Sequence, residues 1–400
     1  MLDVEAIRKV FPALERQLGG RPVIFADNAA TSLKPLCVIQ AVDYYYRHLC
    51  ANVHRGVNVL AQEADALYED SRNSIASLIH ARPAEVIFVR NTTEAINLAA
   101  HLLDLTKKDD VICSLTEHHS NFLPWLARAN VRCVAPDERG RVTPGAFLEA
   151  ATPKTKLFAL GHVSNVTGVV SPVADIIQEA RKRGILTLVD AAQSVSHMPL
   201  DVQSLGCDFL AFSGHKMFGP SGIGVLWARE EFLKSRPPML FGGGMVTSVS
   251  EDGFQVQPPP HGFEAGTPNI EGTLGMGAAA QFLMGLDMDN VRDHSRRLAE
   301  ALINAVASVS GLRAFPLDSS ADRVPIVSFA VGSMSPDDVA AILCNRYNIM
   351  VRSGVHCAEP LVRHFGQRGL VRVSLSVYNT LDEIAYIGES LKSLSSILAR

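Results

Sequence analysis

Cysteine is sparse in this sequence, and neither sign of charge is in large excess. The seven cysteines are an odd number and include no CxxC pair, so neither a disulfide framework nor a zinc knuckle is indicated. The net charge of −4 on 400 residues gives no electrostatic reason to expect a nucleic acid or an anionic membrane as partner. We therefore expect no metal site, no nucleic-acid partner and no membrane partner.

Long apolar runs and a leader segment are also lacking. The most apolar long stretch, residues 275–286, is interrupted by Gln281 and is too short to span a bilayer. The first 18 residues, MLDVEAIRKVFPALERQL, have the pattern of an amphipathic helix rather than that of a signal peptide. These features predict a soluble, cytoplasmic protein.

The composition and the length are those of a folded, two-domain chain. Hydrophobic residues make up 47% and charged residues 20%, which excludes a disordered chain. Four hundred residues are more than one small core accommodates. We expect a large domain over residues 18–272 and a small domain formed by residues 1–17 together with residues 273–400.

From about residue 20 to residue 230, short β-rich runs alternate with segments of helical periodicity. Several of the runs are almost entirely apolar, as strands covered on both faces must be. The predicted strands span residues 22–26, 85–89, 110–114, 131–134, 157–161, 186–190, 209–212 and 224–227. The alternation predicts an α/β fold with a mostly parallel central sheet.

The later part of the chain has a different order of elements. Residues 240–269 are rich in glycine and proline and predict an irregular loop. Beyond this loop we expect helices over about residues 272–286 and 291–308, and then strands over residues 326–331 and 370–376. This order predicts a smaller α+β domain.

Five polar segments directly follow or end predicted strands: NTTE, EHHSN, HVSN, DAAQ and SGHK. Ligands of open α/β sheets bind at the carboxyl ends of the strands. We therefore expect the five segments to form one site at a single edge of the sheet.

Two residues of these segments, Lys216 and Asp190, indicate the chemistry. Both lie at the ends of apolar strands, where a buried carboxylate such as Asp190 is costly unless it is paired. A pyridinium nitrogen would pair with the aspartate, and a lysine can attach the same cofactor as a Schiff base. The two residues predict pyridoxal 5′-phosphate (PLP) as cofactor, held by Lys216.

The phosphate of such a cofactor needs hydrogen-bond donors. The segment NTTEAINLAA has the form of a helix start, where free backbone N–H groups and the helix dipole bind anions. Ser213 and His215 flank Lys216 and are further candidate donors. An imidazole of EHHSN can stack on the cofactor ring, whereas metal binding by the adjacent His118 and His119 is not expected because their side chains diverge.

With these motifs the chain resembles the class V aminotransferases, a group of fold-type I PLP enzymes. The segments DNAAT, HRG, TTE, EHHSN, HVSN, SGHK and FEAGTPN, with Asp190 and Gln193, carry the resemblance over essentially the whole chain. Within the group the chain is similar to the SUF-type, or group II, cysteine desulfurases, because RSGVHCAEPL sets Cys357 between R-x-G-x-H and a proline. The resemblance implies the fold of a fold-type I PLP-dependent transferase.

The resemblance also implies an activity and partners. L-cysteine would be converted to L-alanine, and its sulfur would pass to Cys357 as a persulfide. A sulfur-acceptor protein would collect this sulfur for a sulfur carrier or for iron–sulfur cluster assembly. Lys216 would hold PLP and move the Cα proton, and the enzyme would be a homodimer.

The other roles implied by the resemblance are cofactor and substrate contacts. Cofactor contacts are expected from Thr92, Thr93, His118, Asn165, Asp190, Gln193, Ser213, His215, Lys216 and, across a dimer interface, Thr267. Substrate contacts are expected from Ala29, Asn165, Arg352 and Arg372. His54, in HRG, is a candidate substrate-side or proton-relay residue, and His118 is expected to act in catalysis.

Residue chemistry agrees with a nucleophilic role for Cys357. Sulfur transfer needs a thiolate, whereas an ordinary cysteine with a pKa of about 8.5 is mostly protonated at neutral pH. Arg352 and His356 lie beside Cys357 in the sequence and would favour the anion. Arg372 suits a substrate carboxylate because its planar guanidinium binds two oxygens at once.

Three departures from the family pattern concern the surroundings of Cys357. Val355 stands where many relatives have a polar residue, and Glu359 adds a negative charge two residues beyond the thiol. Residues 125–133 form a shorter segment than the family pattern predicts. We expect these departures to affect the rate and the acceptor rather than the cofactor.

Three other functions stay open on the sequence alone. The same pocket suits a selenocysteine lyase acting on L-selenocysteine. A relative of secondary metabolism would use PLP for another C–S cleavage, as a C–S lyase, or for an epimerisation. The third is a scaffold for sulfur-carrier proteins, against which the intact Lys216, Asp190 and Cys357 argue.

Overall fold

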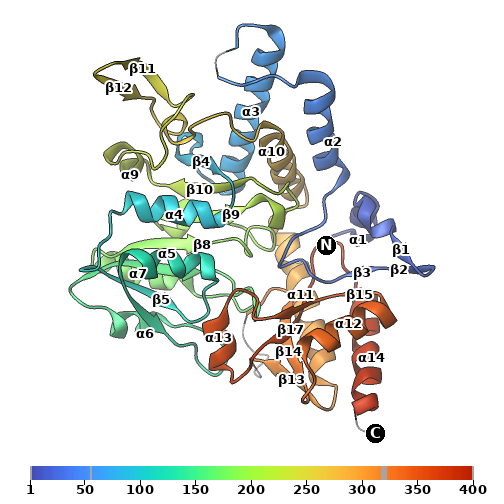
Figure 1. Cartoon of the computed structure of the whole chain (residues 1–400). Coiled ribbons are helices and arrows are strands. Elements are labelled where there is room, and N and C mark those ends of the chain that lie inside the picture. The colour runs from blue at the N-terminus through green and yellow to red at the C-terminus, as the bar shows by residue number, and fades with distance from the viewer. Residues whose placement is uncertain (1, 55, 317–321, 399–400) are drawn as a thin grey trace.

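Seven strands form the central sheet of the computed structural model, which describes residues 2–54, 56–316 and 322–398 (Figure 1). Their order across the sheet is β4-β10-β9-β8-β7-β5-β6, and β10 runs antiparallel to both of its neighbours. The strands are β4 (Val86–Val89), β5 (Asp110–Ser114), β6 (Asn130–Val134), β7 (Thr155–Gly161), β8 (Leu186–Asp190), β9 (Phe209–Ser213) and β10 (Gly224–Ala228). The prediction of a mostly parallel α/β sheet is confirmed.

Helices cover both faces of this sheet. One face packs against α4 (Thr92–Leu102), α5 (Leu123–Arg128) and α9 (Glu230–Ser235). The other face packs against α3 (Val59–Leu78), α6 (Pro144–Ala150), α7 (Val173–Lys182), α8 (Val202–Leu205) and α10 (Ile270–Gly285). Alternate residues of a strand enter the two cores, as Phe209 and Leu210 do, because side chains alternate along a strand. Apolar residues therefore fill most interior positions of these strands, and the polar side chains that this sheet brings to the pocket lie at or after the carboxyl ends of its strands.

A second, antiparallel sheet has the order β13-β14-β17-β16. Its strands are β13 (Leu312–Phe315), β14 (Ile326–Val331), β16 (Arg352–Gly354) and β17 (Leu370–Ser374). The helices of this part are α11 (Met288–Ala307), α12 (Pro336–Tyr347), α13 (Glu359–His364) and α14 (Leu381–Leu398). Within the described ranges, no helix is long and apolar enough to cross a membrane. The predicted domain boundaries stay a prediction.

The N-terminal segment reaches both sheets. Its elements are α1 (Val4–Lys9), η1 (Pro12–Glu15), β1 (Gln17–Leu18), β2 (Arg21–Pro22), β3 (Ile24–Phe25), α2 (Leu36–Tyr44) and η2 (Tyr45–Leu49). Strand β3 pairs in parallel with β15 (Ile349–Met350), which brings the N-terminal segment against the C-terminal part of the chain. Phe11 packs in the core of the large sheet, whereas Ile24 packs in the core of the small one.

Three of the predicted elements are wrong in detail. The N-terminal helix ends at Lys9, because the proline at position 12 disfavours helical backbone at Phe11 before it. The strand predicted at 22–26 is divided between β2 and β3. The predicted loop at 240–269 contains an exposed hairpin, β11 (Val246–Ser250) with β12 (Gly253–Val256). Its neighbouring glycines and prolines conceal the alternating pattern VTSVS.

Candidate functional site

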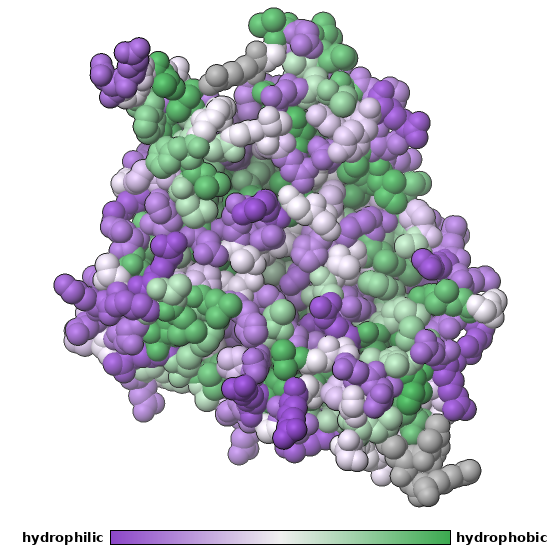
Figure 2. All heavy atoms as spheres, in the orientation of Figure 1, coloured by the Kyte–Doolittle hydropathy of each residue, from purple (hydrophilic) through white to green (hydrophobic). Residues whose placement is uncertain are grey.

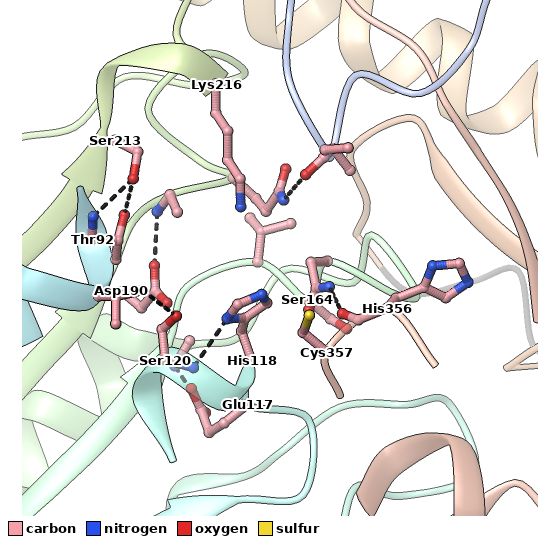
Figure 3. A pocket seen from close by; sticks show the side chains of 18 of the residues that line it. Thr92, Glu117, His118, Ser120, Ser164, Asp190, Ser213, Lys216, His356 and Cys357 are labelled. Atoms are coloured by element: carbon pink, nitrogen blue, oxygen red, sulfur yellow. Dashed lines mark hydrogen bonds between the residues drawn. The ribbon is translucent and has the colours of Figure 1, made fainter. Parts of the chain in front are cut away.

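The polar strand ends meet in one pocket of about 280 Å³ (Figure 3). Residues at the carboxyl ends of β4, β5, β7, β8 and β9 line it on one side, and residues of β16 and β17 line it on the other. Of the predicted site residues, those that line it are Ala29, Thr92, Thr93, His118, Asn165, Asp190, Gln193, Ser213, His215, Lys216, Arg352, Cys357 and Arg372. The expectation of one site at this edge is therefore met by the geometry.

Lys216 and Asp190 extend into the pocket from neighbouring strands. The Asp190 carboxyl group is buried and accepts a hydrogen bond from the N–H of Ala192 at 3.0 Å. Burial raises the pKa of Asp190 and lowers the pKa of Lys216, and the attraction between the two groups partly opposes both changes. A cationic ligand beside Asp190 would stabilise its charged form, and Lys216 loses its proton more readily than an exposed lysine.

Hydroxyl groups surround the start of α4 at one end of the pocket. The N–H of Thr92 donates to Oγ of Ser213 at 2.8 Å, and the two hydroxyl oxygens lie 2.6 Å apart. The hydroxyls of Thr93 and Ser120 share a hydrogen bond of 2.7 Å. Together with the positive end of the α4 dipole, these hydroxyls form a place for an anion.

His118 and His215 face the pocket as neutral rings. Burial, and after it the charge of Lys216, lowers the pKa of His118 to about 3 and that of His215 to about 4. Nδ1 of His118 accepts a hydrogen bond from the N–H of Ser120 at 3.1 Å, which leaves its proton on Nε2. A neutral ring at this position can stack on an aromatic cofactor without adding charge.

Glu117, the first residue of EHHSN, also lines the pocket, although nothing in that motif marks it as a site residue. Its buried carboxyl group accepts hydrogen bonds from the N–H of Gly161 at 2.9 Å and from Nδ2 of Asn121 at 2.6 Å. Burial raises the pKa of Glu117 to about 8. These hydrogen bonds tie the loop after β5 to the end of β7 and so fix the position of His118.

Arg352 and Arg372 are direct neighbours on the paired strands β16 and β17, and such like charges need a counter-charge. Asp27 supplies it, because its carboxylate oxygens lie 3.0 Å from Nη2 of Arg372 and 3.7 Å from Nη1 of Arg352. Nη1 of Arg372 donates to the main-chain carbonyl of Asn165 at 3.0 Å. The buried Nε of Arg372 has no hydrogen-bond partner in the described part of the chain, so it suits a ligand carboxylate.

The Cys357 side chain faces the pocket, but its neighbour His356 points away from it (Figure 3). Nε2 of His356 donates to the carbonyl of Leu370 at 3.0 Å. Burial, followed by the charge of Arg372, lowers the pKa of His356 to about 3. The expectation that His356 favours the thiolate by its charge is therefore wrong. The buried positive groups that interact with Cys357 are Lys216 and Arg372.

The departures from the family pattern have simple structural explanations. Val355 packs against an apolar cluster that includes Leu361, so it points away from polar partners. Glu359 forms an ion pair of 2.7 Å with Arg363 on α13 rather than turning to the thiol. In the short segment, α5 connects to β6 through a single residue, and Trp125 is fully buried.

His54 and Thr267 do not line this pocket. Nδ1 of His54 lies 3.3 Å from Asp65, and its ring contacts that of His261. Nitrogens of these two histidines and an oxygen of Glu69 lie within 4.8 Å of one another, but Glu69 is already paired with an arginine.

Thr267 lines a separate hollow. Arg55 of the HRG motif lies outside the described residues, and roles for His54 and Thr267 stay predictions.

A comparison with known protein families assigns the chain to one of them. The family model of the aminotransferase class-V family matches residues 24–387. The chain belongs to the class-V aminotransferase family. The resemblance inferred from DNAAT, EHHSN and SGHK is thereby confirmed for the family, and its SUF-type subgroup stays a prediction.

The class-V relatives of this chain include cysteine desulfurases. A probable cysteine desulfurase of Streptomyces coelicolor is 41% identical, with 98% of this chain and 97% of the relative covered. A cysteine desulfurase of Cronobacter sakazakii is 40% identical, with 96% of each covered. The apo structure of a cysteine desulfurase from Thermococcus onnurineus NA1 matches with a TM-score of 0.93 at 37% identity, over 99% of both chains. Sequence and structure therefore relate this class-V chain to cysteine desulfurases along its whole length.

Proposed function

We propose that this protein is a PLP-dependent cysteine desulfurase that converts L-cysteine to L-alanine and takes up the sulfur on Cys357. The observation that carries the proposal is the presence of Lys216, Arg372 and Cys357 in a single pocket. Relatives at about 40% identity that are named cysteine desulfurases support it. In the net reaction, the thiol of Cys357 and L-cysteine give L-alanine and a Cys357 persulfide, so that no external oxidant is needed.

The residues of the pocket fit PLP. Asp190 is a buried carboxyl group without a cationic hydrogen-bond partner among the described residues, as a pyridinium nitrogen requires. The start of α4 with Ser213 suits the phosphate, and the neutral ring of His118 suits the aromatic face. When bound, PLP withdraws electrons from the substrate, which permits proton loss at Cα and cleavage of the C–S bond.

The other steps of the proposed reaction belong to side chains of this protein. Lys216, whose pKa is lowered by burial, carries a proton to and from Cα. Arg372 holds the substrate carboxylate, and Asp27 keeps the guanidinium in place. Cys357 attacks the substrate sulfur as a thiolate, next to the positive charges of Arg372 and Lys216.

A second copy of this chain is the proposed partner at an apolar surface. Figure 2 shows green residues gathered at the top of the molecule, above α3. The exposed large apolar side chains of α2, of the segment after it and of the start of α3 are Leu36, Ile39, Tyr44, Tyr46, Val57, Val59 and Leu60. Such a patch marks a protein interface in a soluble protein. The resemblance implies that in such a dimer Thr267 of one copy contacts the cofactor of the other. A monomer in light scattering would exclude this proposal.

The direct test is incubation with L-cysteine and, separately, with L-selenocysteine. We expect stoichiometric L-alanine in the first case and a mass increase of Cys357 by one sulfur. Turnover of L-selenocysteine alone would identify a selenocysteine lyase instead. Pyruvate and ammonia, or an epimerised amino acid, would identify one of the other PLP reactions.

Turnover of L-cysteine without an acceptor is expected to be slow after a fast first cycle. Four residues separate β16 from α13, and the proline at position 360 lies in the first turn of α13, so the thiol cannot reach distant acceptors. The persulfide then blocks the next cycle until a partner or a small thiol removes it. Dithiothreitol should therefore raise the steady-state rate of alanine release. A steady state as fast as the burst, without any thiol, would contradict this prediction.

Arg372→Ala is expected to weaken substrate binding strongly. Removing one partner of a buried charged pair costs roughly 2–5 kcal/mol, which is about 30- to 5,000-fold in KM. Arg352→Ala is the matched comparison, because Arg352 is half exposed and its contact with Asp27 is longer. Its effect should stay within about fivefold. Equal effects of the two substitutions in steady-state kinetics would contradict the assignment of the carboxylate to Arg372.

A further inference from the structure

His119, the second histidine of EHHSN, holds the segment that carries Cys357 at two points. Its main-chain N–H donates to the carbonyl of Cys357 at 2.7 Å. Its ring Nε2 accepts a hydrogen bond from the main-chain N–H of Glu359 at 3.3 Å. The chain is thus held at the cysteine itself and two residues beyond it.

The ring contact supplies a missing helix cap. Glu359 is the first residue of α13, and the residue before it, Ala358, has no side-chain oxygen to cap the helix. The first N–H groups of a helix have no partner inside the helix. The ring of His119 accepts one of them, with its own proton on Nδ1.

The segment depends on such contacts because its backbone is strained. His356 and Cys357 are consecutive non-glycine residues with φ of 52° and 54°, in the left-handed region that side chains rarely adopt. Nδ2 of Asn165 donates to the carbonyl of His356 at 2.7 Å and adds a third contact. A strained bend of this kind persists only where its surroundings hold it.

The short helix that begins with His119 is itself held in place by buried hydrogen bonds. His119 begins η4 (His119–Asn121), and the fully buried Asn121 donates to Glu117 at 2.6 Å. Asn121 also accepts the indole N–H of Trp125 at 3.1 Å, and Trp125 is fully buried in the core of the large sheet. His119 therefore connects a fixed point beside the large sheet to the segment that joins β16 to α13.

We propose that His119 is a positioning residue that keeps the Cys357 segment in its left-handed bend, so that the exposed thiol stays at the pocket with Lys216 and Arg372. The positioning is a property of the fold. Its consequence for sulfur transfer rests on the proposed function: the thiol stays aligned with the substrate sulfur, and an acceptor must approach the mouth of the pocket.

The test compares how the Cys357 thiol reacts with a small and with a bulky reagent in the PLP-loaded protein. Iodoacetamide is the small reagent and a polymer-linked maleimide the bulky one, with labelling at Cys357 followed by mass spectrometry. In His119→Ala the bulky-to-small rate ratio should rise about fivefold, the size of effect expected for loss of a helix cap. His364→Ala, at the exposed end of the same helix, is the control and should keep the ratio of the unmodified protein.

Two further substitutions, His119→Gln and His119→Asn, keep the test decisive if His119→Ala does not fold. His119→Gln replaces the ring nitrogen with an amide oxygen that can accept the hydrogen bond from the Glu359 N–H. It should leave the ratio near that of the unmodified protein. His119→Asn is too short to reach and should raise the ratio, and it should also speed hydrogen exchange at the Glu359 amide. An unchanged ratio in His119→Ala and His119→Asn would overturn the positioning role.

The two proposals fail in different ways. If the unmodified protein makes no alanine but the reactivity ratio responds to His119, the desulfurase function is wrong and the positioning role stands. If alanine is made at the normal rate and the ratio does not respond, only the positioning role is wrong. A role of His119 in overall stability alone would also change the labelling of Cys207, which is buried just before β9, whereas the pocket lies at the other end of that strand.

Discussion

A Cys357→Ser variant is expected to form no persulfide from L-cysteine, and its alanine release should fall by roughly a thousandfold or more. The hydroxyl of serine is not ionised at neutral pH and cannot accept the substrate sulfur, whereas the rest of the pocket is unchanged. The measurements are single-turnover alanine release and the mass of the peptide that contains residue 357. Cofactor binding, read from the visible absorption of the protein, should be the same as before.

The control for this variant is Cys37→Ser, an exposed cysteine of α2 that does not line the pocket. It should release alanine at the rate of the unmodified protein. If Cys357→Ser releases alanine at that rate too, a different group accepts the sulfur. Activity of Cys357→Ser on L-selenocysteine alone would agree with the proposal, because selenide is a better leaving group than sulfide.

The second large effect is expected for Lys216→Ala. Loss of the group that moves the Cα proton should lower alanine release by about 10²–10⁴-fold or more, the range for one general acid–base residue. Removal of the amine also leaves Asp190 without the nearby charge that opposes the rise of its pKa. Alanine formation and the visible absorption of added PLP are the two measurements.

Lys234→Ala is the matched control, because Lys234 is exposed and only forms a surface ion pair with Glu230. It should change neither the absorption nor the rate. Alanine release by Lys216→Ala within tenfold of the unmodified protein would exclude Lys216 as the acid–base residue. Circular dichroism separates a local effect from loss of the fold.

The sequence predicts those site residues whose position follows from a neighbouring strand. Asp190 ends the buried strand β8, and Lys216 follows the buried strand β9 by three residues. Because side chains inside such strands are mostly apolar, polar residues at or after their ends stand out. The same apolar character allows most strands of the large sheet to be predicted from the sequence. The hairpin β11–β12 escaped prediction because it is exposed and lies among glycines and prolines.

The parts that the sequence does not reveal depend on contacts between distant loops. Asp27 lies 345 positions from Arg372, and nothing near Asp27 in the sequence indicates that it balances two arginines. Glu117 and His119 look like ordinary members of a polar loop until the loop is seen against Gly161 and the segment after β16. Sequence proximity also misleads, because His356 adjoins Cys357 and yet turns its ring towards Leu370.

The pairing of β3 with β15 has a consequence for the growing chain. Asp27 follows β3 closely, and Arg372 follows β15 by about twenty residues, so the guanidinium site forms only after both ends of the protein have met. A partly synthesised or partly unfolded chain can contain Lys216 and the whole large sheet while lacking the Arg372–Asp27 pair. If Arg372 binds the substrate carboxylate as proposed, such a chain would have no place for the substrate, and sulfur transfer would begin only after folding is complete.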